Sequence, residues 1–113
     1  MTIKHDKFES IAREIISNLI HEEMEMEEID FGPITVTKAV VSKDKSYLDI
    51  YVSSFKNIEL LPKALSKHGF NIQRNANKLI KTRRVPKIRF RADKTGEDMA
   101  YISGIINDLD TNK

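Results

Sequence analysis

The chain lacks cysteine, has few glycines and contains no long apolar run, and each absence removes a class of protein. Without cysteine it can form neither disulfide bonds nor thiolate metal sites, which is typical of a reducing compartment. Its four glycines are isolated, so there is no glycine-rich loop to hold a phosphate. No apolar run reaches the length of a membrane span, and residues 1–10 lack a signal peptide's apolar stretch. We therefore expect a cytoplasmic protein with no membrane partner.

Side chains for catalysis or metal binding are also poorly placed. The three histidines lie far apart in sequence, and no nucleophile has a base beside it. The acidic residues 22–30 lack the spacing of a calcium-binding loop, and we interpret them as a solvated loop after the first helix. Asp44 and Asp49 flank a turn, where turn chemistry and cross-strand pairing explain them better than acid–base catalysis. We expect no enzyme activity, no metal and no cofactor.

The distribution of charge is the most informative feature of the sequence, because acidic and basic residues are concentrated in different parts of the chain. The 113 residues carry a net charge of only +2. Residues 63–94 hold eleven of the nineteen basic side chains and one acid, a net charge of +10. Residues 1–30 hold three basic side chains and nine acids, a net charge of −6. This asymmetry indicates a polyanion, usually nucleic acid, bound on one side of the molecule.

Apolar periodicity predicts the elements of the first half. Between Phe8 and Ile20, apolar residues recur at steps of three and four, which indicates a helix; Asp6 and Glu9 resemble a capping box at its start. Residues 34–41 and 47–53 are rich in β-branched or alternating residues, which predicts an antiparallel hairpin with a bulge near Lys38. The helix stripe comprises Phe8, Ile11, Ala12, Ile15, Ile16, Leu19 and Ile20.

The second half continues with helices around a third strand. Residues 60–68 predict a helix that tolerates Pro62 only in its first turn, and Gly69 interrupts it. A further helix then runs to Val85 and Pro86, residues 87–92 alternate as a strand, and Thr95 caps a last helix. Residues 110–113 are expected to fray. The inner stripe of the further helix is Ile72, Ala76, Leu79 and Ile80, and that of the last helix is Met99, Ile102, Ile106 and Leu109.

The order helix, strand, strand, helix–Gly–helix, strand, helix predicts a single α+β domain over residues 1–113. Three strands form the sheet, and the helices pack on one face of it in a two-layer arrangement.

The basic residues fall on faces of these elements. On the further helix they recur opposite the apolar stripe, and on the third strand they share one face. The alternative is a solvated face, but such faces mix signs, and residues 63–92 contain no acid. Phe70, Tyr47 and Tyr51 could stack on bases, although packing is the preferred interpretation. The predicted RNA-binding residues are Lys67, Arg74, Lys78, Lys81, Arg83, Arg84, Lys87, Arg89 and Arg91, with Gly69 at the helix kink.

Several motifs together resemble the ribosome-binding factor A family over nearly the whole chain. Ile34-Thr35-Val36-Thr37 and Val41-Ser42-Lys43-Asp44 are similar to its hairpin, and Ile50-Tyr51-Val52-Ser53 to its second strand. Gly69-Phe70, Arg83, Val85-Pro86-Lys87-Ile88-Arg89-Phe90 and Asp93 follow in the family's order. The chain departs from the family at Lys67, where a small residue is usual. Gly69-Phe70-Asn71-Ile72 also has no second glycine to make a GxxG loop.

The resemblance implies a type II KH-like fold and a non-catalytic role. It implies binding to 16S rRNA in immature small (30S) ribosomal subunits during late rRNA processing. Members are linked to growth at low temperature and to assembly GTPases on the same particle. Without a GxxG loop, we expect recognition of RNA shape and phosphates rather than a four-nucleotide clamp. We expect a monomer.

Three other functions stay open at this point. One is a protein–protein adaptor that uses an open sheet edge or the acidic end of the first helix. Another is a general binder of structured RNA without ribosome specificity. The third, a small RNA-modifying or RNA-cleaving enzyme, lacks a recognisable catalytic cluster.

Overall fold

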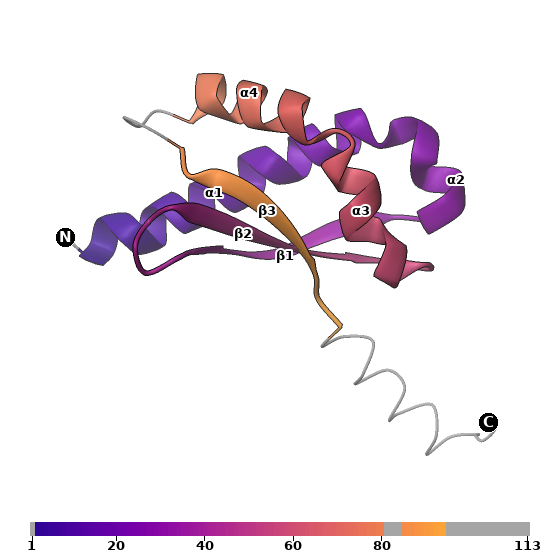
Figure 1. Cartoon of the computed structure of the whole chain (residues 1–113), viewed down its shortest axis with the longest axis horizontal. Coiled ribbons are helices and arrows are strands. Elements are labelled where there is room, and N and C mark those ends of the chain that lie inside the picture. The colour runs from indigo at the N-terminus through magenta and orange to yellow at the C-terminus, as the bar shows by residue number, and fades with distance from the viewer. Residues whose placement is uncertain (1, 81–84, 95–113) are drawn as a thin grey trace, which may run out of the picture.

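The computed structural model of the protein describes residues 2–80 and 85–94 (Figure 1). The predicted last helix and the tail, together with Lys81, Arg83 and Arg84, lie outside the described residues. The described elements are α1 (Thr2–Glu23), the 3-10 helix η1 (Glu25–Glu27), α2 (Glu28–Phe31), β1 (Ile34–Val41), β2 (Tyr47–Ser54), the 3-10 helix η2 (Ile58–Leu60), α3 (Leu61–Ser66), α4 (Gly69–Leu79) and β3 (Lys87–Ala92).

The apolar stripe of α1 is narrower than predicted. Ala12, Ile16, Leu19 and Ile20 are buried in the core, whereas Ile11 is exposed. Phe8 and Ile15 are only partly buried at the edge of the same cluster. A single stripe on a helix covers little more than a quarter-turn, so residues at its flanks are left in solvent.

The predicted capping box at Asp6 and Glu9 is wrong. Because α1 begins at Thr2, both residues lie within the helix rather than at its start. The Glu9 Oε2 atom instead accepts a hydrogen bond of 2.8 Å from the backbone N–H of Val41. The carboxylate thus satisfies a backbone donor on the edge of β1 that faces away from β2, a contact between residues far apart in sequence.

The antiparallel hairpin of β1 and β2 is confirmed. Its register shifts between Val36 and Lys38, which confirms the predicted bulge. In the turn, Asp44 Oδ1 accepts hydrogen bonds from the backbone N–H of Ser46 and the hydroxyl of Ser42. These hydrogen bonds, that from the Ser46 backbone first, lower the pKa of Asp44. The turn role expected of this carboxylate is therefore confirmed.

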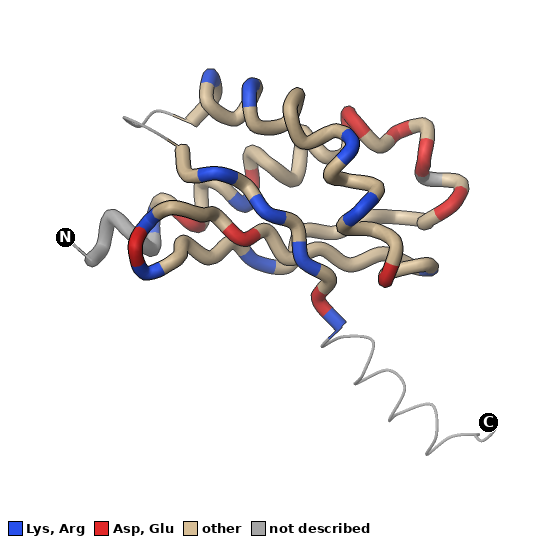
Figure 2. Tube along the Cα trace, in the orientation of Figure 1, with Lys and Arg blue, Asp and Glu red and all other residues tan. Residues whose placement is uncertain are grey.

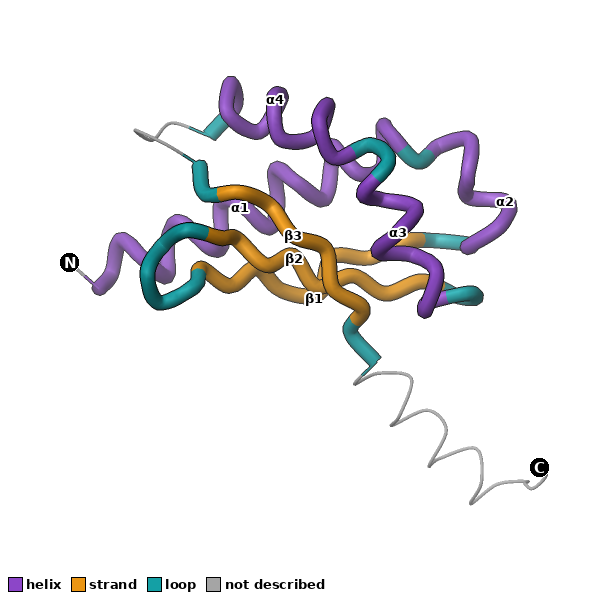
Figure 3. Tube along the Cα trace, in the orientation of Figure 1, coloured by secondary structure: helices purple, strands orange, loops and turns teal. Residues whose placement is uncertain are grey.

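Strand β3 pairs in parallel with β2, so the sheet order is β1-β2-β3. A parallel pair needs a crossover, which η2, α3 and α4 supply. Leu48, Ile50 and Val52 are fully buried and point toward the helices. Figures 1 and 3 show α1 and α4 running along one side of the sheet. The predicted two-layer arrangement, with the described helices on one face, is confirmed.

The acidic stretch is not the solvated loop that we expected. After α1 ends at Glu23, the chain forms η1 and α2 before it enters the sheet. Met24 and Phe31 anchor this segment, because both are buried in the core. The apolar residues spaced among the acids therefore fold the segment into short helical turns.

The crossover helices agree with the prediction at their start and differ at their end. Pro62 lies in the first turn of α3, as expected. The expected helix over residues 60–68 is shorter, since α3 ends at Ser66. Helix α4 ends at Leu79, well before Pro86, because Ile80 turns extended to bury its side chain. Leu79, predicted to face inward, is exposed.

Candidate nucleic-acid interface

Helix α4 presents cations and one aromatic ring to solvent. Arg74 and Lys78 are exposed on the side opposite buried Ile72 and Ala76. The Arg74 guanidinium lies 5.6 Å from the centre of the Phe70 ring, within the range of a cation–π interaction. Phe70 is 77% exposed, so the preferred interpretation of it as a packed side chain is wrong.

Strand β3 places its cations on the sheet face opposite the helices. Tyr47 pairs with Lys87, and Tyr51 pairs with Arg91, in the parallel register. Lys38 lies 4.7 Å from the centre of the Tyr51 ring. Both tyrosines are half-buried, which agrees with packing on the sheet surface.

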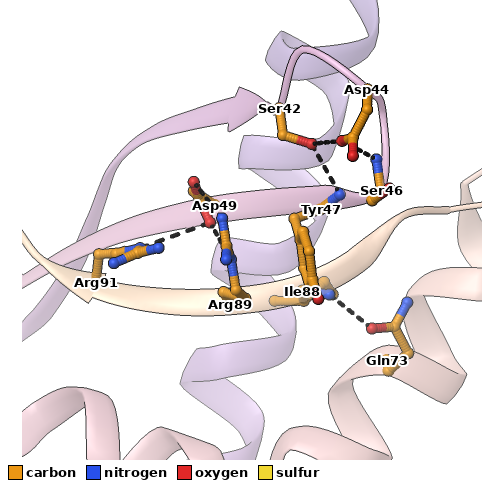
Figure 4. A network of polar contacts seen from close by, with 9 residues as sticks. All are labelled: Ser42, Asp44, Ser46, Tyr47, Asp49, Gln73, Ile88, Arg89 and Arg91. Atoms are coloured by element: carbon orange, nitrogen blue, oxygen red, sulfur yellow. Dashed lines mark hydrogen bonds and ion pairs between the residues drawn. The ribbon is translucent and has the colours of Figure 1, made fainter.

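Asp49 of β2 holds two of the β3 arginines (Figure 4). Arg89 Nε and an Nη donate to its carboxylate oxygens at 2.8 and 3.2 Å, and Arg91 Nε lies 3.6 Å away. The Asp49 hydrogen bond, outweighing desolvation, raises the pKa of Arg89. Arg89 also stacks 3.9 Å from the centre of the Tyr47 ring. The cross-strand pairing expected of Asp49 is confirmed, and it fixes where these two cations point.

A groove of about 790 Å³ separates α4 from β3. Gln73 braces its two walls, because its Oε1 accepts from the Ile88 N–H at 2.9 Å and its Nε2 donates to the Pro86 carbonyl at 3.2 Å. Figure 4 shows this amide reaching from α4 toward Ile88. We call this feature the cationic groove; its lining residues are Ser66, Gly69, Phe70, Gln73, Lys87, Ile88, Arg89 and Phe90.

His68, which lies between α3 and α4 beside the groove, contacts two carboxylates of the acidic segment, residues 22–30. Its Nδ1 lies 2.9 Å from Glu23 Oε1 and its Nε2 3.1 Å from Glu27 Oε2. Desolvation of the ring lowers the pKa of His68, but hydrogen bonds and charges from Glu27 and Glu23 outweigh it and raise that pKa. A protonated ring can donate to both carboxylates at once.

Comparison with known proteins identifies the family. The ribosome-binding factor A family model matches residues 4–106. The chain belongs to the ribosome-binding factor A family. Ribosome-binding factor A of Caldicellulosiruptor saccharolyticus is 31% identical over 118 residues, covering 98% of this chain and 87% of that protein. The Thermosipho africanus protein is 27% identical over 110 residues, covering 94% and 87%.

Solved structures of ribosome-binding factor A share the fold. The crystal structure from Thermus thermophilus has a TM-score of 0.66 at 24% identity, covering 78% of this chain and 94% of that one. A solution structure of a Thermotoga maritima protein described as a putative ribosome-binding factor A gives a TM-score of 0.57 at 24% identity, covering 77% and 88%. A Thermus thermophilus homology model fitted into a cryo-electron microscopy map of a 30S complex gives 0.52 at 24% identity, covering 66% and 92%. The predicted type II KH-like fold is therefore confirmed.

The structure places most of the predicted RNA-binding residues on or between neighbouring elements. Figure 2 shows basic segments along α3, α4 and β3, and acidic segments over η1 and α2. Lys67 is exposed where α3 meets α4, and Gly69 begins α4. Three of the predicted residues, Lys81, Arg83 and Arg84, are not among those described. The described cations of the set are Lys67, Arg74, Lys78, Lys87, Arg89 and Arg91.

At this interface, sequence reasoning gave Asp49 a cross-strand role without its partner, and it missed Gln73. Asp49 supplies a negative charge among cations that looked single-signed, and Gln73 joins the two walls. Local patterns give no signal for either, because their partners lie 40 and 15 residues away. A parallel register between β2 and β3 would have been needed to find Asp49.

The described residues contain neither a membrane-spanning helix nor a cluster of metal ligands. Within residues 2–80 and 85–94, no helix is long and apolar enough to cross a membrane. In those same ranges, no group of three or more His, Asp or Glu residues could hold a metal ion.

Proposed function

We propose that the protein is an assembly factor of the small ribosomal subunit. It binds 16S rRNA in immature 30S particles through the cationic groove and assists late rRNA processing by binding rather than by catalysis. The observation that supports this most is that five predicted cations lie on α4 and β3, the two elements that border one groove, and a sixth lies in the link before α4; Lys87 and Arg89 line the groove itself. We also propose that it acts as a cytoplasmic monomer formed by one domain over residues 1–113. The family resemblance implies that it meets assembly GTPases on the particle.

Rigid placement of the cations suits recognition of folded RNA. A guanidinium has five N–H donors, and Arg89 directs two of them at Asp49, so the remaining donors are held in a fixed orientation for phosphate oxygens. The Tyr47 ring supports the same group from one side. Preorganised donors lose little conformational entropy on binding, and phosphate contacts fix orientation without reading sequence.

Phe70 offers a surface for base stacking, which the basic side chains that contact phosphates do not replace. Its exposed ring borders the cationic groove beside Arg74, so an unpaired base could stack on it. A junction with both a bent backbone and an unstacked base would then bind more tightly than a uniform helix. Binding of one RNA conformation stabilises that conformation over its competitors, which is how such a factor would act on an unfinished particle.

Co-sedimentation with immature small subunits, mature small subunits and large subunits across a salt series tests the proposal. We expect preferential binding to immature small subunits that falls steeply as salt rises. The double change Arg74→Ala and Lys78→Ala should reduce the slope of log affinity against log salt by about one to two. Asp49→Asn removes the negative charge at the interface and should make the salt dependence of binding steeper.

The matched control removes the same charge elsewhere, with Lys7→Ala and Lys43→Ala on exposed sites. It should leave binding close to that of the unmodified protein. Equal binding to every particle would indicate a general binder of structured RNA instead. Equal losses in the two double variants would mean that net charge, rather than the position of the α4 cations beside the cationic groove, drives association.

A further inference from the structure

Three of the most exposed large apolar side chains lie in the acidic segment and the loop that packs against it. Met26 is 87% exposed, Phe55 84% and Ile29 80%. Met26 belongs to η1, Ile29 to α2 and Phe55 to the loop after β2. Exposed apolar groups that gather in one region mark interaction sites more often than singly scattered ones do.

The loop that carries Phe55 is held firmly against α2. The Lys56 N–H donates to the Phe31 carbonyl at 3.0 Å, and Asn57 Nδ2 donates to the Asp30 carbonyl at 2.8 Å. Asn57 adopts the left-handed conformation, with φ 59°, which directs its side chain back to α2. Two hydrogen bonds therefore fix Phe55 beside the helix that presents Ile29.

Gly32 brings the two segments still closer. It has φ +74°, and a Cβ atom built there would lie 2.7 Å from the Phe55 Cβ. Any side chain at Gly32 would push the loop away. The base of Phe55 is thus packed while its ring stays in solvent, an arrangement that core formation does not explain.

The apolar residues of the acidic segment divide between two sides. Met24 and Phe31 are buried beneath it, so they account for its folding. Met26 and Ile29 face solvent and add nothing to the core. Exposing them has an aggregation cost that a binding role would offset.

Acidic residues are concentrated in the same elements as these apolar groups and in the neighbouring ones. Exposed acids come from α1, η1, α2 and η2, and the described cations next to them in the chain are Lys56, beside Phe55, and Lys63, four residues after Glu59. Figure 2 shows acidic segments concentrated over η1 and α2. RNA would be repelled here, whereas a positively charged protein surface is attracted and steered. The exposed acids are Glu22, Glu25, Asp30 and Glu59.

We infer that Met26, Ile29 and Phe55, with the surrounding acids, form a docking surface for a basic protein segment. We call this surface the acidic docking end. Its partner offers an apolar pocket or face to Phe55 and Ile29, and Lys or Arg side chains to the carboxylates. The surface uses residues separate from the cationic groove, so one molecule can hold RNA and a basic protein together.

A titration with defined peptides tests the surface without ribosomes. The probes are an amphipathic Lys/Leu peptide and a Glu/Leu peptide with the same apolar pattern. In methyl NMR spectra, the signals of Met26 and Ile29 should shift and saturate with the Lys/Leu peptide only. Phe55→Ser and Ile29→Ser should each weaken this binding by about tenfold.

Ile11→Ser is the matched control, because it removes an exposed isoleucine from α1, outside the acidic docking end. It should leave the peptide affinity unchanged. Since residues 29 and 55 are largely exposed, their variants should keep the melting temperature of the unmodified protein. Equal response to both peptides, or equal weakening by Ile11→Ser, would overturn the inference.

A second experiment places the surface on the small subunit, and this part rests on the proposed function. A photoreactive benzoylphenylalanine at position 55 should crosslink to protein, whereas one at position 70 should crosslink to RNA. Loss of particle binding with intact peptide binding would refute the proposed function alone. A crosslink from position 55 to RNA would overturn the acidic docking end.

Discussion

The cationic groove and the acidic docking end present charge of opposite sign, and they are built in different ways. At the groove, Asp49 holds Arg89 and Arg91 of β3 and Gln73 joins the two walls, so polar contacts set the geometry. At the acidic docking end, one backbone hydrogen bond, one hydrogen bond from the Asn57 side chain and a glycine hold the loop that carries Phe55 in place. The first design suits a ligand that is charged throughout, and the second suits a ligand with both apolar and basic groups.

The two regions are also connected. His68 sits at the start of α4 and contacts Glu23 and Glu27 of the acidic segment. One apolar core, which includes Ile16, Ile50 and Ile72, underlies both. The comparison is therefore between two surfaces of one folding unit, and three groups of substitutions test whether the surfaces can be separated.

The largest effect is expected from Ile72→Ala, because Ile72 attaches α4 to the core and is fully buried. The free energy of unfolding should fall by about 2–5 kcal/mol in urea denaturation. Amide signals of Arg74 and Ile29 should disappear in the same transition, since one core carries both surfaces. Leu79→Ala on the same helix is the control, and its exposed side chain predicts a change within about 0.5 kcal/mol. Two separate transitions would show that the two surfaces belong to different folding units.

A pair of glycine substitutions should have a smaller and unequal effect. Gly32→Ala, at the acidic docking end, meets both a positive φ and the Phe55 Cβ, so a loss of about 1–3 kcal/mol is expected. Gly69→Ala, beside the cationic groove, meets no atom within 4 Å, and a change of at most about 0.5 kcal/mol is expected. Thermal melts of both variants check this. A large loss at Gly69 would mean that the kink needs a glycine for reasons beyond sterics.

The smallest effect is the pH dependence of the contact between the two regions. The pKa of His68 is raised in the folded protein above its usual value of 6.5. Its contribution to stability is therefore fully present below that unfolded value and is lost as pH rises through the folded pKa. His68→Gln should be less stable than the unmodified protein at pH 5.5, and the difference should shrink by pH 8.5. Denaturation at both pH values measures this.

A second variant separates the charge of His68 from its shape. Glu27→Gln keeps a hydrogen-bond acceptor but removes a negative charge that raises the pKa of His68. The pH dependence should weaken in this variant. If His68→Gln were equally destabilising at both pH values, the histidine would act only through packing.

Much of the fold could be predicted because it depends on short-range pattern. The alternation of Leu48, Ile50 and Val52 identified β2, and the break near Lys38 identified the bulge. Two of the errors share one cause, which is that each involved a contact with residues distant in sequence. Glu9 bonds to Val41 rather than capping α1, and α4 ends where Ile80 reaches the core.

The sequence by itself determined the separation of charge, the order of the elements and the side of each element that carries its cations. These follow from composition and from periods of 3.6 and 2 residues, which a chain carries before it folds. Only the tertiary structure decided that Asp49 pairs with Arg89, that Gln73 joins α4 to β3 and that Phe55 lies on Gly32. The parallel crossover and the packed loop bring these residues together, and no local pattern encodes a contact that depends on how distant segments pack.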